Sequence, residues 1–94
     1  MTKDQLPNDL ETRLIRQALE GSHDAFSGLV RIHQANVRGC IARFVLSPDF
    51  VDDLAQETFV RAYTRLSTYK GESPFGAWLF GIARNAALRH LRDQ

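Results

Sequence analysis

The 94 residues are enough for one domain with a modest hydrophobic core, and a hydrophobic content of 44% excludes a wholly disordered chain. The net charge of +1 is unevenly spread: residues 58–94 carry +4, residues 1–30 carry −2 and residues 31–57 carry −1. A basic C-terminal part suits an acidic partner such as a nucleic acid, although many basic helices only face solvent. A single cysteine excludes an internal disulfide, and neither a signal peptide nor a membrane-spanning run is present, so we expect a soluble, cytoplasmic protein.

Hydrophobic periodicity predicts an all-α fold, a compact four-helix bundle in which a short N-terminal helix precedes a three-helix core. The first helix is expected over about residues 8–20, with Gly21 as a left-handed cap. Either Ser22 or Asp24 is expected to cap a long second helix that runs to about Leu46. All 94 residues are expected to form a single domain, because no linker or repeat divides them.

Four residues of the second helix carry a specific expectation. Gly28 and Gly39 each weaken a helix by roughly 1 kcal/mol relative to alanine, and close packing against a neighbouring helix would explain both. His33 and Cys40 lie on the apolar stripe of this helix, so we expect them to be core residues rather than a metal or redox site.

Two further helices follow the break at residues 47–49. The third is expected over residues 50–66 and the fourth over residues 74–91. Ser73 is expected to cap the fourth helix, with Pro74 at the first helical position, where a missing N–H has no consequence. The residues of the third helix expected to face the core are Val51, Leu54, Ala55, Phe59, Ala62 and Leu66.

The third helix presents Asp53, Gln56, Glu57 and Val60 on one side, within about one and a half turns. The acidic residues could simply favour the helix N-terminus, with Glu57 and Arg61 forming a surface pair worth ~0.3–0.5 kcal/mol. The same side could instead dock a basic partner helix, with an amide hydrogen bond from Gln56 and an apolar contact from Val60. A metal or acid–base site is disfavoured, because no histidine lies at matching helical spacing.

The fourth helix separates an apolar arc from a polar arc that carries Arg84, Asn85 and Arg89. Ala77 and Gly81 lie within the polar arc, so its surface has low relief. Arginine neutralises phosphate or binds guanine, and asparagine pairs with an adenine edge, so this arc suits nucleic acid. The alternative is a solvated helix in which Gly81 makes room for an aromatic neighbour.

The segment before the fourth helix offers Tyr69, Lys70, Ser73 and Phe75. An aromatic face, a cation, a hydroxyl and a helix N-terminus together suit an unpaired base and its phosphate. The alternative is a loop whose aromatic rings only anchor the core. The chain contains no catalytic triad, cysteine–histidine pair or phosphate-binding loop, so we expect no enzymatic activity, cofactor or metal.

The segments "DDLAQETFVRAYTRL" and "YKGESPFGAWLFGIARNAALRHLR" together closely resemble region 2 of bacterial sigma factors of the extracytoplasmic-function (ECF) type, in the sigma-70 family. The resemblance covers nearly the whole chain from Leu10. It implies the region 2 helical bundle and a role in transcription initiation, with the third helix bound to the clamp coiled coil of the β′ subunit of core RNA polymerase. The implied polymerase-binding residues are Asp53, Gln56, Glu57, Phe59, Val60 and Tyr63.

The same resemblance implies that the loop and the fourth helix recognise and melt the promoter −10 element by capturing a flipped non-template base. An anti-sigma factor is a further partner that the family implies. Pro74 and Gly81 depart from the family pattern, and the sequence stops at Gln94, before a linker and region 4, so we expect a fragment of a longer protein. The implied DNA-binding residues are Tyr69, Lys70, Ser73, Phe75, Arg84, Asn85 and Arg89.

Two other functions remain open on the residues alone. A transcriptional regulator would insert the basic helix into the major groove of intact duplex DNA, usually as a symmetric dimer. A protein-interaction domain would use the arginine stripe on an acidic partner and would show no preference among nucleic-acid sequences.

Overall fold

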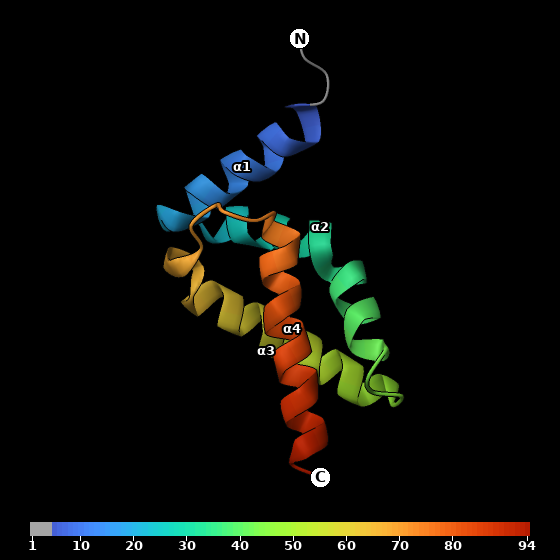
Figure 1. The fold of residues 1–94 in the computed structure, drawn as a ribbon. Helices are drawn as coiled ribbons and strands as arrows, with labels where there is room; N and C mark the ends of the chain where they lie inside the picture. Colours follow the sequence, from blue (N-terminus) through green and yellow to red (C-terminus); the bar gives the residue numbers. More distant parts are fainter. Residues whose placement is uncertain (1–4) are drawn as a thin grey trace. The chain divides into compact units, whose positions relative to one another are not determined.

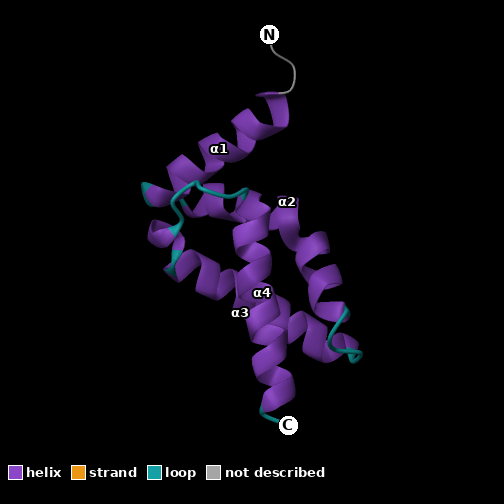
Figure 2. Cartoon of the chain, viewed as in Figure 1, coloured by secondary structure: helices purple, strands orange, loops and turns teal. Residues whose placement is uncertain are grey.

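A computed structural model describes the backbone of residues 5–94 and the side chains from residue 10 onward. This part of the chain is helical and contains no strand, so the all-α prediction is confirmed (Figure 1; Figure 2). The chain divides into two compact units, residues 1–32 and residues 33–94, and the second helix contributes to both. Among the described helices, none is long and apolar enough to cross a membrane. The elements are α1 (Gln5–Leu19), α2 (His23–Ala42), α3 (Pro48–Thr64), the 3-10 turn η1 (Leu66–Thr68) and α4 (Phe75–Arg92).

The turn from α1 into α2 matches its predicted capping chemistry. Gly21 has a φ of +104°, a left-handed conformation that favours glycine. Its N–H donates to the carbonyl of Ala18 at 3.0 Å, and the N–H of Ser22 donates to the carbonyl of Gln17 at 3.0 Å, which is the Schellman pattern. The Ser22 hydroxyl then accepts the N–H of Ala25 at 3.1 Å, so this serine is the α2 cap.

The two glycines of α2 have different surroundings. A Cβ added to Gly28 would lie 3.3 Å from Cδ1 of Leu14, so the expected close packing is confirmed there. A Cβ added to Gly39 would meet nothing within 4 Å, and the residue is exposed. The packing explanation is therefore wrong for Gly39.

The boundary between α2 and α3 differs from the prediction. α2 ends at Ala42, because the N–H of Phe44 donates to the carbonyl of Ile41 at 2.9 Å and tightens the last turn. Pro48 then occupies the first position of α3, after Ser47 in an extended conformation with φ −71° and ψ 122°. α3 thus starts two residues earlier than expected, since a proline at this position fits a helix start.

The core of the second unit lies where α3 and α4 pack together, and the two helices cross in Figure 1. The buried side chains include many alanines, which allow helices to approach closely. Thr58 was not expected in this core, yet it is fully buried because its hydroxyl donates to the carbonyl of Leu54 at 2.7 Å. The buried residues on these two helices are Val51, Leu54, Ala55, Thr58, Ala62, Phe75, Leu79, Ile82, Ala83, Ala86 and Ala87.

The start of α4 requires a correction. Pro74 has a ψ of 144° and is the N-cap, so the helix begins at Phe75. The Pro74 carbonyl accepts the N–H groups of Ala77 and Trp78 at 3.0 and 3.2 Å. Ser73 therefore precedes the cap, and the cap carries no side-chain hydrogen bond.

Gly39→Ala should raise the free energy of unfolding by about 0.5–1 kcal/mol, because alanine favours the helix and nothing obstructs a Cβ there. Gly21→Ala is the opposite control and should lower it by about 1–2 kcal/mol, because alanine is strained at that positive φ. Urea denaturation followed by circular dichroism measures both. A Gly39→Ala variant with a lower free energy of unfolding than wild type would contradict the conclusion that a side chain at this position is free of steric conflict.

Candidate functional site

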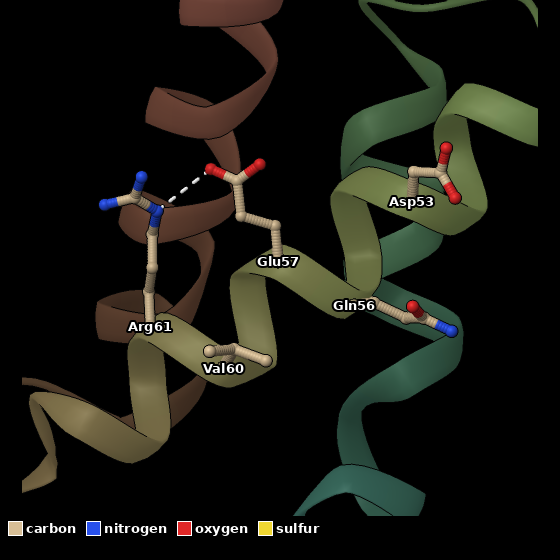
Figure 3. Close-up of a pocket in the computed structure, with 5 residues that line it drawn as sticks. All are labelled: Asp53, Gln56, Glu57, Val60 and Arg61. Carbon is tan, nitrogen blue, oxygen red and sulfur yellow. Dashed lines mark hydrogen bonds and ion pairs between the residues drawn. The ribbon is translucent and has the colours of Figure 1, made fainter.

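The polar side of α3 forms an open surface pocket lined by Asp53, Gln56, Glu57, Val60 and Arg61, which we call the α3 patch (Figure 3). Asp53 and Gln56 are exposed, and Val60 is 63% exposed despite being apolar. All four residues predicted to share this side therefore line one pocket. Its mixture of carboxylate, amide and apolar groups suits a protein partner with cationic and apolar side chains.

The helix-cap explanation of the acidic residues accounts for little of this patch. Because α3 begins at Pro48, Asp53 lies beyond the first turn of the helix. The helix dipole favours negative charge mainly within the first turn, so it stabilises Asp53 little. Its neighbour Asp52 instead binds Arg38 of α2 at 2.5 Å. Within the described residues, no group of three or more histidine, cysteine or acidic side chains could hold a metal ion.

Phe59 and Tyr63, the other residues expected to bind the polymerase, differ in accessibility. Tyr63 is 43% exposed, one turn beyond Phe59 on α3. Phe59 was expected from the sequence both to face the core and to bind the polymerase. The structure leaves its side chain half-buried, which is intermediate between the two expectations. Tyr63 therefore extends the accessible surface beyond the α3 patch. Phe59 contributes less to this surface, because its side chain is only partly exposed.

Glu57 forms an ion cluster that joins α3 to α4. Its Oε2 accepts Arg61 Nε at 2.9 Å, which confirms the predicted pair one helical turn apart. The same oxygen also accepts a hydrogen bond from the Nη2 of Arg89 on α4. This second contact was not predicted, because helical spacing within one helix gives no information about a residue on another. It brings a proposed polymerase-binding residue and a proposed DNA-binding residue into direct contact.

The pKa of Glu57 reflects its position in this cluster. Partial burial by itself would raise the pKa of the carboxyl group. Hydrogen bonds and positive charge from Arg61 and Arg89 outweigh that effect and leave the pKa below its ordinary value. The charged carboxylate is therefore the form that the folded protein favours.

The segment between η1 and α4 is a loop closed by its own contacts. Gly71 has a φ of +78°, and the Tyr69 hydroxyl donates to the carbonyl of Ser73 at 2.5 Å. Lys70 and Ser73 are exposed, and Tyr69 is half-buried. The tyrosine ring also contacts Trp78, with ring centroids 5.3 Å apart. The loop therefore presents one cation and one hydroxyl beside a partly accessible aromatic pair.

Phe75 does not have the role that the sequence suggested. It is 3% exposed, so its ring cannot provide an accessible face for a base to stack on. It contacts His33 and Tyr69, each at a centroid distance of 5.4 Å, and Trp78 at 5.5 Å. Phe75 thus supports the aromatic cluster from inside, and His33 is the buried core histidine that was expected. Trp78 joins this cluster although its role was not predicted.

The polar side of α4 is accessible along Ala77, Gly81, Arg84 and Asn85, which we call the α4 face. A Cβ at Gly81 would meet nothing within 4 Å, so no aromatic neighbour packs there and that part of the alternative is wrong. Two small residues beside an exposed guanidinium and an exposed amide leave a low surface. Arg89, predicted for the same arc, is half-buried against Glu57 instead.

Glu57→Gln should remove a pH-dependent part of the stability. Because the folded-state pKa is lowered, the charged form contributes fully above about pH 5, and the contribution is lost as the pH falls through the folded pKa. Wild type should therefore exceed Glu57→Gln in unfolding free energy near pH 6, and the difference should shrink below about pH 4. Urea denaturation across this range measures it. A difference that does not change between pH 3 and pH 6 would contradict the stabilising role of the cluster.

Comparisons with known proteins identify the family. Residues 29–94 match the family model described as Sigma-70 region 2. The RNA polymerase sigma-H factor of Pseudomonas aeruginosa is 37% identical over 86 residues, which cover 92% of this chain and 45% of that protein. The ECF RNA polymerase sigma-E factor of Escherichia coli K12 is 38% identical over 81 residues, which cover 86% of this chain and 42% of that protein. The chain thus spans less than half the length of these curated relatives.

Two solved structures are similar as well. An engineered region 2 of sigmaE in complex with GTAAAA has a TM-score of 0.83 and 32% identity, covering 100% of this chain and 94% of that one. CnrH in complex with the cytosolic domain of CnrY has a TM-score of 0.78 and 34% identity, covering 85% of this chain and 52% of that one. The chain therefore belongs to the sigma-70 region 2 family, as a region 2 domain of the ECF sigma factors, which are not enzymes.

Proposed function

We propose that the chain acts in bacterial transcription initiation by binding core RNA polymerase and the promoter −10 element. In this proposal the α3 patch, with Tyr63 and the exposed part of Phe59, docks on the clamp coiled coil of the β′ subunit. The loop around Tyr69 captures a flipped non-template base, and the α4 face contacts the adjoining DNA. The protein works in the cytoplasm, where polymerase and promoter are found.

The separation of two chemically different surfaces carries this proposal. The α3 patch offers Asp53 and Gln56, an acidic and an amide group, whereas the α4 face offers Arg84 and Asn85. All four side chains are exposed, so neither pair is part of the core. A carboxylate-bearing surface suits a basic protein helix, and a cationic surface with an amide suits a polyanion with readable base edges.

The loop supports the proposed base capture through two accessible groups. Lys70 can form an ion pair with a phosphate, and the Ser73 hydroxyl can form a hydrogen bond with a base edge. Tyr69 and Trp78 offer the partly accessible rings, while Phe75 holds them from beneath. Stacking on such rings stabilises an unpaired base by about 1–3 kcal/mol, which offsets much of the cost of leaving the duplex.

The relatives suggest ligands for direct tests. The engineered sigmaE region 2 was solved in complex with GTAAAA, an adenine-rich sequence that suits the amide of Asn85. CnrH was solved in complex with the cytosolic domain of CnrY, and the anti-sigma factor that the family resemblance implies is a further proposed partner of this chain. A major-groove regulator would bind paired DNA more tightly than single strands, and our proposal requires the opposite order for the −10 sequence.

Gln56→Ala should weaken binding to a fragment that contains the clamp coiled coil by at least about 1 kcal/mol, because a directional hydrogen bond within the docked surface is lost. Gln34→Ala, at an exposed position of α2, is the matched control and should bind as wild type does. Isothermal titration calorimetry measures both affinities, and circular dichroism checks the fold. Wild-type affinity in Gln56→Ala would remove the docking assignment.

Asn85→Ala should reduce the preference for the −10 sequence over a scrambled one by about 1–3 kcal/mol, because a bidentate base contact is lost. Arg84→Gln should instead weaken all sequences alike and lower the salt dependence of binding by about 0.7 in the logarithmic slope. Fluorescence titration with single-stranded GTAAAA and its permutations separates the two effects. Equal weakening of every sequence by Asn85→Ala would exclude direct base recognition by this residue.

A further inference from the structure

Glu57 connects the α3 patch to Arg89, a residue of α4 next to the α4 face. It lines the α3 patch, and it accepts hydrogen bonds from Arg61 on its own helix and from Arg89 on α4. The Glu57 and Arg89 side chains are 37% and 34% exposed, so an incoming partner could reach either. The contact therefore joins a carboxylate of the α3 patch to a cation on the helix that carries the α4 face.

Arg89 is well placed to extend the α4 face if this contact opens. It follows Asn85 by four residues, so the two side chains lie on neighbouring turns of the same helix. With its guanidinium bound to Glu57, it shares one carboxylate with Arg61, and the donor that binds Glu57 is directed toward α3. Released, it would add a phosphate-binding guanidinium one turn beyond Asn85.

We propose that Glu57 is a positioning residue that holds Arg89 away from DNA until a cation of the polymerase engages Glu57. This inference rests on the proposed function of the two surfaces. It deepens that function, because it makes docking at the α3 patch increase the affinity of the α4 face for DNA.

The charges of the cluster favour such an exchange. One carboxylate already binds two guanidinium groups, so the cluster of Glu57, Arg61 and Arg89 carries a net positive charge. A third cation at the carboxylate would add repulsion in a partly desolvated place. Arg89 would leave, because Arg61 is anchored one turn away on the same helix and Arg89 has a polyanion to move to.

The test uses the 94-residue chain without polymerase, since Glu57→Gln removes the negative charge that holds Arg89 and leaves only a weaker, neutral acceptor. Binding to labelled single-stranded GTAAAA should tighten by about two- to fivefold, the range for one exposed phosphate contact. The logarithmic salt slope should steepen by about 0.7, because one more phosphate is neutralised. Asp49→Asn, at an exposed position of α3, removes the same charge without touching Arg89 and measures the general electrostatic effect.

Arg89→Gln completes the experiment. In the wild-type background it should change DNA affinity much less than Arg84→Gln does, because Arg89 is held by Glu57. In the Glu57→Gln background it should abolish the gain down to the level of Asp49→Asn. Equal losses from Arg89→Gln and Arg84→Gln in wild type, or a gain in Glu57→Gln that survives Arg89→Gln, would overturn the proposal.

The outcome is separable from that of the proposed function. If wild type and every variant fail to bind GTAAAA or other single strands, the DNA-binding function itself is wrong. If wild type binds and Glu57→Gln binds no better than Asp49→Asn, the DNA-binding function stands and the control by Glu57 is refuted.

Discussion

The close contact between α3 and α4 determines where the functional side chains of the second unit can point. Alanines such as Ala62 and Ala83 are fully buried on the two helices, and Thr58 joins them by bonding its hydroxyl to its own backbone. Because a helix that buries one side must expose the opposite side, this packing directs Gln56 of α3 and Asn85 of α4 outward. The two surfaces are thus consequences of one core.

The same contact also limits how independent the two surfaces are. Helices that approach closely bring long side chains at their edges within reach of one another, as happens between Glu57 and Arg89. Such an ion pair contributes little stability where it is a third exposed, so its consequence lies in which cation is available to a partner. One small domain can then couple two partners through a single carboxylate, without a large rearrangement.

Sequence reasoning predicted the helices, and it predicted which side of α3 and of α4 is buried and which is exposed. Hydrophobic periodicity reports directly on the buried side of a helix. It missed Thr58, because a hydroxyl satisfied by its own helix packs like an apolar group. It misplaced the start of α4, since Pro74 adopts an extended ψ and serves as the cap in place of Ser73. It could not find the partner of Arg89, and it gave Gly39 a packing role that its open surroundings contradict. These errors concern contacts between segments and the local path of the backbone.

Mapping of backbone amide shifts tests the separation of the surfaces most directly. The isotope-labelled chain would be titrated in turn with the clamp coiled-coil fragment and with single-stranded GTAAAA. The account predicts that the fragment shifts residues 53–63, that the oligonucleotide shifts residues 69–73 and 81–85, and that the two sets meet only around Glu57 and Arg89. Shifts of the same residues by both ligands outside the neighbourhood of Glu57 and Arg89, or shifts of the core by either ligand, would contradict it.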